Sequence, residues 1–168
     1  AFSAQDILAR KPDAVVLAMG AVPAVPPVPG IQDEKVVDCV TALTGPALAG
    51  EAILVVGGGL VGCETALGFA QQGKKVTLVE ALPDILSAGI PVPEMNSSML
   101  RDLLDEAGVT IRTRCRLARI TPAGAVVQGP EGETEVPAQH VVLAVGFRPR
   151  PSLADQLAGQ GIAVYQVG

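Results

Sequence analysis

Apolar residues gather in short runs that glycines, prolines and charged residues separate, and this pattern predicts an α/β chain. The run Ala52–Val56 leads into three consecutive glycines, after which a helix is predicted from Leu60 to about Gln72. Gly73 is a typical helix terminator, and a second apolar strand follows it at Val76–Val79. The order strand, glycine turn, helix, strand predicts a βαβ unit with two parallel strands.

Further elements are predicted on either side of this unit. Lys11–Gly20 holds an apolar run that predicts one buried strand, and His140–Val145 predicts a fully apolar strand of the parallel type. A proline-bearing loop over residues 81–93 precedes a second helix, which extends from Pro93 to Ala107 and ends at Gly108. The apolar stripe of this amphipathic helix consists of Met95, Met99, Leu103 and Ala107.

From Val109 onward, the pattern shifts toward the alternation of half-exposed strands. Four short strands, separated by turn-prone residues 121–124 and 129–132, predict an antiparallel meander attached to the parallel unit. These strands are Val109–Thr113, Cys115–Ile120, Ala125–Gln128 and Glu133–Val136. Towards the end of the chain, a loop with a short helix is predicted over Phe147–Leu157 and a last strand over Ala163–Gly168.

A proline-rich stretch, Ala21–Gly30, marks a predicted boundary. Proline fixes φ and removes a hydrogen-bond donor, so this stretch is expected to be an extended connector outside any sheet. Asp13–Gly20 resembles Gln139–Gly146, which indicates a chain that enters from one domain and returns toward it. The predicted division is therefore residues 1–30, 31–150 and 151–168.

The glycines after Ala52–Val56 have the spacing G-x-G-x-x-G, which is typical of dinucleotide-binding turns when a strand precedes it and a helix follows. Gly57 allows the tight turn, Gly59 lets a pyrophosphate approach the backbone, and Gly62 lets the helix pack close to the strand. Gly58 completes the turn. The free N–H groups from Leu60 through Val61 to Cys63, at the positive end of the helix, are expected to bind phosphate. A glycine-rich turn with no ligand is the alternative.

Glu80, with Ala81 beside it, ends the second strand about twenty residues beyond the turn, where a carboxylate can accept hydrogen bonds from a ribose diol. A carboxylate repels a 2′-phosphate, and no arginine follows before Arg101, so NADH is favoured over NADPH. A solvated acid with no ligand is the alternative. Glu64, in the first helical turn, is explained equally by the helix dipole and by a role at the nicotinamide end. Together these features predict an α/β, Rossmann-like three-layer domain with a parallel sheet plus an antiparallel β-meander.

Composition narrows the class of partner. The net charge is −5, which argues against nucleic acid, and no apolar run approaches the roughly 18 residues of a membrane span. The start of the chain lacks a secretory pattern, and three cysteines without a C-x-x-C pair argue against a disulfide framework or zinc site, so a cytoplasmic setting is expected. Hydrophobic residues make up 49% of the chain and aromatic residues 2%, which fits a core of Val, Ala and Leu or a surface that normally packs on something absent.

No residue set for acid–base, nucleophilic or metal catalysis is visible, so no catalytic and no metal-binding residues are predicted. Cys63 is interpreted as a small buried apolar residue, and His140, the only histidine, as structural. Hydride transfer needs none of these groups in a nucleotide-binding domain, because the nicotinamide carries the reaction and the protein places it.

Three segments together resemble the pyridine-nucleotide domain of the two-dinucleotide flavoprotein superfamily, which includes the pyridine nucleotide-disulfide oxidoreductases. They are Val55–Glu64, Val76–Glu80 and Val142–Pro149. Within the superfamily the chain is most similar to the NADH:flavin oxidoreductases related to 2,4-dienoyl-CoA reductase and trimethylamine dehydrogenase. The resemblance implies that an NAD(P)H domain is inserted into a discontinuous FAD domain.

The resemblance also gives the outer segments an identity. Lys11–Gly20, with Met19 where the family usually has Thr, and residues 21–30 are similar to the end of the first FAD segment and its crossover. Val164–Gly168 is similar to the strand before the family's flavin-binding Gly-Asp pair. The resemblance implies that residues 1–30 are a stub of the FAD domain, that residues 31–150 bind NAD(P)H and that residues 151–168 return toward the FAD domain. The remaining FAD domain and an FMN and iron–sulfur barrel are then expected as partners, with FAD bound by the parent protein and not by this chain.

By the same resemblance, Glu64 matches an acid that contacts the nicotinamide carboxamide, and Ala144, Val145 and Gly146 match a strand end that borders the nucleotide. The expected function is an NADH-binding domain that presents nicotinamide to a flavin held elsewhere in a flavin oxidoreductase, and the chain alone is expected to be inactive. The alternative is a structural or ADP-binding domain that exchanges no hydride. An FAD domain is disfavoured, because the proline-rich connector and a separate strand precede the glycine turn.

Overall fold

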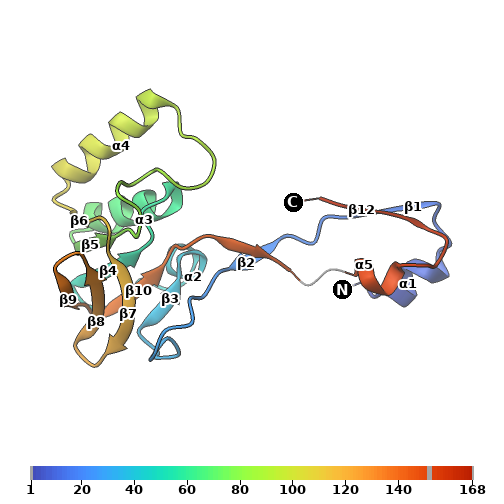
Figure 1. Ribbon diagram of the computed structural model, residues 1–168, viewed down its shortest axis with the longest axis horizontal. Helices are drawn as coiled ribbons and strands as arrows, with labels where there is room; N and C mark the ends of the chain where they lie inside the picture. Colours follow the sequence, from blue (N-terminus) through green and yellow to red (C-terminus); the bar gives the residue numbers. More distant parts are fainter. Residues whose placement is uncertain (1, 151–152, 168) are drawn as a thin grey trace. The chain divides into compact units, whose positions relative to one another are not determined.

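The computed structural model describes residues 2–150 and 153–167, and the chain divides into two compact units (Figure 1). The larger unit spans Pro23–Gly146, and the smaller one combines the residues up to Val22 with those from Phe147 onward. Both boundaries differ from those predicted at residues 30 and 150. Much of the proline-rich crossover belongs to the larger unit because Ile120 N donates to Pro29 O at 2.9 Å. Pro151, Ser152 and Gly168, in the predicted return segment, lie outside the described residues.

The larger unit is built on a five-stranded parallel sheet with the order β3-β10-β4-β5-β6. Its strands are β3 (Val36–Asp38), β10 (His140–Leu143), β4 (Ala52–Val56), β5 (Lys75–Val79) and β6 (Thr110–Arg112). From β4 the chain adds β5 and β6 on one side and later β10 on the other. The strand order therefore reverses between β4 and β10.

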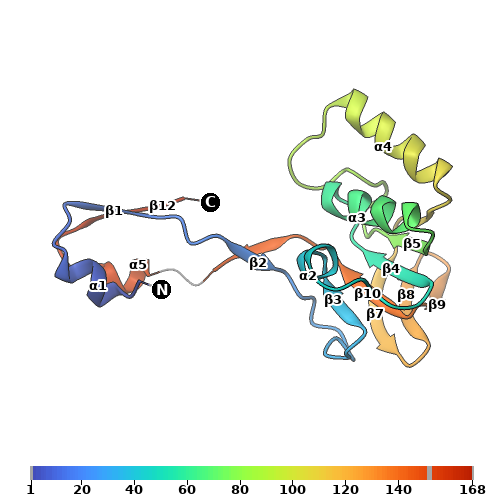
Figure 2. The same cartoon turned by 180° about the vertical axis from the view of Figure 1, so that it is seen from behind.

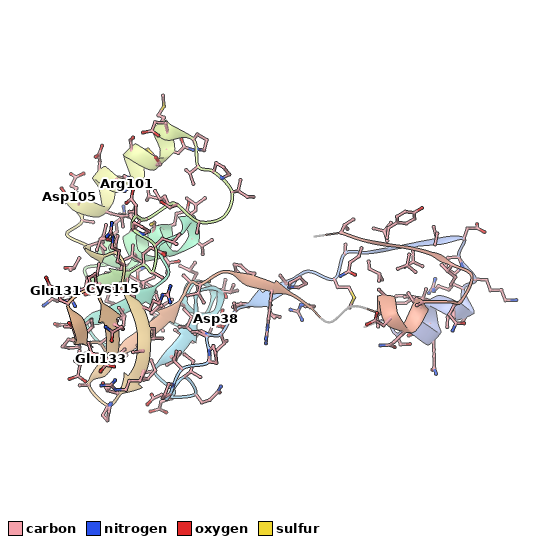
Figure 3. The ribbon with its side chains drawn as sticks, viewed as in Figure 1. Asp38, Arg101, Asp105, Cys115, Glu131 and Glu133 are labelled. Atoms are coloured by element: carbon pink, nitrogen blue, oxygen red, sulfur yellow. The ribbon has the colours of Figure 1, made fainter. Side chains whose placement is uncertain are left out.

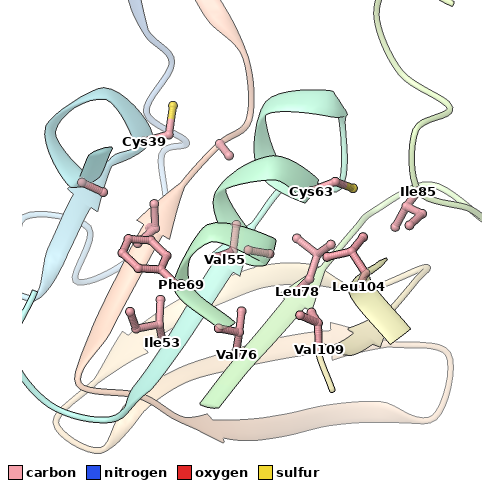
Figure 4. Close-up of a cluster of buried hydrophobic side chains, with 14 of the residues drawn as sticks. Cys39, Ile53, Val55, Cys63, Phe69, Val76, Leu78, Ile85, Leu104 and Val109 are labelled. Carbon is pink, nitrogen blue, oxygen red and sulfur yellow. The ribbon is translucent and has the colours of Figure 1, made fainter. Parts of the chain in front are cut away.

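Helices cover one face of this sheet, and alternate strand residues meet them. The helices are α2 (Cys39–Thr44), α3 (Leu60–Gln71) and α4 (Glu94–Glu106). Ile53 and Val55 of β4 pack under Phe69 of α3, and Leu104 of α4 joins the same buried cluster (Figure 4). Because side chains alternate across a strand, Leu54 of β4 belongs to the cluster on the opposite face.

The opposite face carries an antiparallel meander of β7 (Arg116–Thr121), β8 (Gly124–Gly129) and β9 (Gly132–Pro137). Val127 and Val136 of the meander pack with Leu54 of β4 and Val141 of β10. In both views α3 and α4 lie on one side of the sheet and the meander on the other (Figure 2). The predicted α/β fold with a parallel sheet and an antiparallel meander is thus confirmed.

Two predictions about the larger unit are wrong. Val109–Thr113 was predicted as part of the meander, but its strand, β6, pairs in parallel with β5. The prediction failed because an exposed edge strand has the same apolar–polar alternation as a meander strand. The apolar stripe of α4 is also misplaced. Leu100 and Leu104 are buried against the core, whereas Met95 is 82% and Met99 56% exposed. Leu100 and Leu104 belong to the same buried cluster as Leu78 and Ile85. Of the predicted stripe, Ala107 packs partly against this cluster, while the two methionines face solvent.

One region for which no helix or strand is predicted is regular. Residues 36–48 contain the edge strand β3 and the short helix α2. Asp38 caps this helix, since its side chain accepts hydrogen bonds from the amides of Val40 and Thr41 at 2.9 and 3.0 Å. A single acidic residue between an apolar pair and a helix was too weak a signal to predict both elements.

The smaller unit contains short elements around a small core. They are α1 (Ala4–Ala9), β1 (Ala14–Leu17), β2 (Ala21–Pro23), β11 (Phe147–Pro149), α5 (Ala154–Leu157) and β12 (Ala163–Gln166). β1 pairs in parallel with β12, and β2 pairs with β11. Among the described residues the buried core consists of Ala4, Leu17 and Leu157.

Three predictions for these outer segments need correction. β1 is not a buried strand: Val16 is 65% exposed, because the two-stranded sheet is covered on one face only. Ala21–Gly30 is not wholly outside a sheet, since β2 covers its first three residues. The strand accepts Pro23 because this proline stands at its end and β2 is an edge strand. α1 and β11 were not predicted. No described helix has the length and apolar character that crossing a bilayer requires.

Candidate functional site

The turn between β4 and α3 is held in a backbone conformation that only glycine accepts. Gly57 has φ +108°, and a Cβ at this position would lie 2.4 Å from the carbonyl oxygen of Ala144. The Gly57 amide donates to Val79 O at 2.8 Å, which ties the turn to the end of β5. The turn is therefore packed between the ends of β10 and β5.

The other two glycines of the motif have different surroundings. A Cβ on Gly62 would lie 1.8 Å from Gly57 O, so the first turn of α3 contacts the glycine turn directly. Gly59, the N-cap of α3, has φ −70° and ψ −178°, which other residues also adopt. No atom of residues 2–150 or 153–167 lies within 4 Å of the place that a Cβ on Gly59 would take, so the space above it is open. Gly57 and Gly62 are needed by the packing of the fold, whereas the fold makes no such demand on Gly59.

The N-terminal turn of α3 offers backbone donors without acceptors. Among the described residues, no acceptor faces the amides of Gly59, Leu60, Val61 and Gly62. The Cys63 amide, which was expected to be free, instead donates to Gly59 O at 2.9 Å within the helix. Leu60 and Val61 are 42% and 40% exposed, and Glu64 is exposed with no hydrogen bond or ion pair in the described part of the chain. Free amides and the positive end of the helix dipole favour an anion here.

Glu80 is buried beside this turn and is not a solvated acid. It is 7% exposed, and its Oε2 accepts from the Gly58 amide at 2.6 Å while its Oε1 accepts from the Leu82 amide at 2.7 Å. These bonds link the glycine turn to the segment after β5. Each carboxylate oxygen retains a second lone pair, so the group can still accept a further hydrogen bond.

The peptide group of Gly58 is held on its carbonyl side as well. Its oxygen accepts from the Leu86 amide at 2.7 Å and from the Cys63 thiol at 3.3 Å. Burial raises the pKa of Cys63 to about 12, so the thiol stays protonated and remains a donor. Cys63 is fully buried and acts as part of the packing under the turn, as predicted.

The end of β10 lies beside the glycine turn, at the point where the strand order reverses. Ala144 is buried and its amide donates to Val56 O at 2.8 Å, while Val145 is 41% exposed. Gly146 has φ +93°, and its carbonyl accepts from the Ala24 amide at 2.9 Å. In open α/β sheets, ligands bind outside the carboxyl ends of the strands at such a reversal. The structure thus brings residues 57–62, 80–81 and 144–146 to the same edge of the sheet.

A charged pair that the sequence did not reveal holds the loop after Glu80. Arg101 of α4 donates from its two terminal nitrogens to the two oxygens of Asp84, each at 2.9 Å, and also to Ile85 O (Figure 3). The hydrogen bonds from Arg101 lower the pKa of Asp84 below its usual value. Asp84 and Arg101 are far apart in the sequence, which therefore gave no signal for the pair. Because Arg101 already binds Asp84, its guanidinium is not free to bind a ligand at the edge of the site.

His140 lies away from this edge. It begins β10 and pairs with Ile53, at the opposite end of the strand from the glycine turn, and its Nδ1 is buried without a hydrogen-bond partner among the described residues. Within the same described part of the chain, no group of three His, Cys, Asp or Glu side chains is arranged to hold a metal ion.

Comparison with known proteins gives a consistent result. A family model described as pyridine nucleotide-disulphide oxidoreductase matches residues 5–166. A cinnamate reductase of Clostridium sporogenes is 34% identical over 145 residues, which are 86% of this chain and 22% of that protein. An NADH oxidase of Thermoanaerobacter brockii is 36% identical over an alignment of 171 positions, which covers 98% of this chain and 26% of that protein.

Among solved structures, a 2-naphthoyl-CoA reductase in complex with 2-naphthoyl-CoA superposes with a TM-score of 0.86 at 27% identity. The match covers 99% of this chain and 25% of the reductase chain. The chain therefore spans about a quarter of the length of these relatives.

Proposed function

The chain belongs to the pyridine nucleotide-disulphide oxidoreductase family, within the two-dinucleotide flavoprotein superfamily, and from this premise we propose that its larger unit binds NADH for a flavin-dependent oxidoreductase. The observation that carries the proposal is the open space above Gly59 beside the unpartnered amides of residues 59–62. A pyrophosphate needs close access to a backbone and several N–H donors, and this turn offers both.

Each group of residues at this edge of the sheet binds a different part of NADH. Residues 57–62 bind the pyrophosphate, and Glu80 with Ala81 lies at the adenosine ribose. Glu64, together with Ala144, Val145 and Gly146, borders the nicotinamide half. Glu64 supports this because it is an exposed acid on α3 without a partner in the described residues. Bound NADH supplies the hydride, and the chain's own task is to hold the coenzyme in place.

The hydride acceptor in this proposal is a flavin outside the larger unit. The smaller unit is then part of an FAD domain, and an FMN and iron–sulfur barrel is a further expected neighbour. Similarity to a cinnamate reductase and to a 2-naphthoyl-CoA reductase supports a relationship to the NADH:flavin oxidoreductases of the 2,4-dienoyl-CoA reductase and trimethylamine dehydrogenase type. NADH is favoured over NADPH because Glu80 places a negative charge at the ribose and the nearby Arg101 is already paired with Asp84.

Gly59→Val tests this proposal without disturbing the fold, since its backbone angles suit valine and no atom opposes the new Cβ. Gly68→Val is a matched control, because Gly68 lies farther along α3 and also has no atom within 4 Å of a Cβ. NADH, NADPH and ADP are titrated into the 168-residue chain by calorimetry. We expect Gly59→Val to weaken NADH binding by at least about tenfold, equivalent to roughly 1.4 kcal/mol, and Gly68→Val to leave it unchanged.

The titration separates the proposal from its alternative. Tighter binding of NADH than of ADP supports a domain that holds the nicotinamide half as well as the adenosine half. ADP binding with no gain from the nicotinamide half indicates an ADP-binding domain instead. Unchanged affinity in Gly59→Val, with circular dichroism showing an intact fold, rules out the pyrophosphate site.

A further inference from the structure

We propose that Arg114 contacts the 2′-phosphate of NADPH, so that this site accepts both coenzymes and Glu80 sets only the remaining preference. The inference rests on the proposed function, because it concerns the adenosine end of the same site. A preference for NADH then rests on Glu80 alone, because Arg114 is an arginine near the ribose segment with no ion pair among the described residues.

Arg114 is held next to the ribose-binding segment by the backbone. It follows β6, whose last residue pairs with Val79 of β5. Three hydrogen bonds join the two segments: Glu80 N to Arg112 O at 2.9 Å, Arg114 N to Leu82 O at 2.9 Å, and Cys115 N to Glu80 O at 2.8 Å. The carboxyl ends of β5 and β6 thus form one connected edge, with Glu80 directly after β5 and Arg114 two residues after the end of β6.

The position of this edge relative to the pyrophosphate site gives it its role. The glycine turn follows β4, and Glu80 ends the next strand of the sheet. A dinucleotide with its pyrophosphate at α3 and its ribose at Glu80 therefore extends its adenosine half from β4 toward β5 and β6. Arg114 is at the end of that path. A phosphate on the ribose 2′ oxygen would lie between the two strand ends that carry Glu80 and Arg114.

Arg114 is also available, unlike two other arginines of this unit. Arg101 is bound to Asp84, and Arg119 is bound to Glu133 at 2.7 Å. Arg114 is exposed and has no ion pair or side-chain hydrogen bond among the described residues. Its backbone has φ +56°, which is unfavourable for an arginine, and the flanking bonds to Leu82 and Glu80 hold it there. An arginine whose backbone is held at this edge, and whose guanidinium has no partner among the described residues, is suited to bind a phosphate.

The test uses Arg114→Asn, because asparagine tolerates positive φ and removes the charge, so the variant is expected to fold. Arg114→Lys keeps the charge, and Arg116→Asn removes an exposed arginine two residues further on, at the start of β7. The dissociation constants of NADPH, NADH, 2′,5′-ADP and 5′-AMP are measured for the 168-residue chain and each variant. The two adenosine compounds report the 2′-phosphate independently of the nicotinamide half.

We expect Arg114→Asn to weaken NADPH and 2′,5′-ADP by about five- to tenfold while NADH and 5′-AMP change less than about twofold. Arg114→Lys and Arg116→Asn should keep the NADPH-to-NADH ratio of the unmodified chain. An unchanged ratio in Arg114→Asn, or the same loss in Arg116→Asn, overturns the role of Arg114 and leaves the proposed function standing. If the unmodified chain binds neither coenzyme, the proposed function fails and this inference fails with it.

Discussion

Replacing Glu80 with glutamine tests whether this carboxylate is part of the structure of the glycine turn. The side chain is 7% exposed and accepts two short hydrogen bonds, from the Gly58 amide at 2.6 Å and from the Leu82 amide at 2.7 Å. A glutamine of the same shape has one carbonyl oxygen and one NH2 group. Only one of the two amides can then keep an acceptor, and the other faces a second donor.

The magnitude follows from which bond is kept. The less costly arrangement turns the amide oxygen toward Gly58, whose surroundings are buried, and leaves the Leu82 amide to solvent at the exposed residue. Hydrogen bonds to charged groups contribute about 1.5–3 kcal/mol and neutral ones about 0.5–1.5 kcal/mol. Losing one charged bond and reducing the other to a neutral one lowers the free energy of unfolding by about 2.5–4.5 kcal/mol. At about 2–4 °C per kcal/mol, the melting temperature falls by roughly 5–18 °C.

Glu64→Gln is the matched control, because it removes the same charge from an exposed residue that has no partner among those described. We expect it to change stability by less than about 0.5 kcal/mol. Urea unfolding followed by circular dichroism measures both variants, and amide hydrogen exchange at Gly58 and Leu82 reports the local effect. A Glu80→Gln variant within about 1 kcal/mol of the unmodified chain, with unchanged exchange at Gly58, would refute the reasoning.

Two further predictions concern the packing around the turn. Gly62→Ala places a Cβ 1.8 Å from Gly57 O and should lower the free energy of unfolding by at least about 2 kcal/mol. Gly68→Ala, on the same helix with no described atom within 4 Å of the new Cβ, should raise it by about 0.5–1 kcal/mol. Thermal melts compare the two variants, and equal effects would contradict the packing argument. Burial raises the pKa of Cys63 from 9.0 to about 12, so the thiol loses its proton at lower pH in the unfolded chain than in the folded one. The contribution of the protonated thiol to stability is therefore complete below about pH 9 and is lost as the pH rises toward about 12. Urea titrations at pH 8 and pH 10.5 should show a smaller decline in Cys63→Ala than in the unmodified chain, and parallel declines would exclude this role for the thiol.

The parts of the fold that could be predicted are those in which the signal is local. A strand, a glycine turn, a helix and an acid follow one another between Ala52 and Glu80, and each is recognised from its own residues or those next to it. Pairing is not local in this sense. β6 was assigned to the meander because alternation does not distinguish a parallel edge strand from an antiparallel one. The exposure of Val16 likewise depends on what covers β1, which its own sequence does not state.

The contacts within the site were less predictable than its position. Glu80 was predicted to bind the ribose, but nothing in the sequence indicated that its oxygens bind the amides of Gly58 and Leu82. Arg114 was overlooked for the same reason, since it reaches the segment after β5 through a neighbouring strand and not through the chain itself. Its positive φ also had no sequence signal, because arginine rarely adopts this conformation.

The peptide group of Gly58 is fixed from both sides, by Glu80 on its amide and by Leu86 and Cys63 on its carbonyl. These three partners come from the end of β5, the following loop and α3, so the turn is preorganised for the coenzyme that we propose it binds. A flexible loop would lose conformational entropy when it binds a coenzyme. In this turn that loss occurs during folding instead, so it does not weaken binding. Substitutions in residues 84–86 that loosen this peptide should therefore reduce coenzyme affinity without touching the coenzyme.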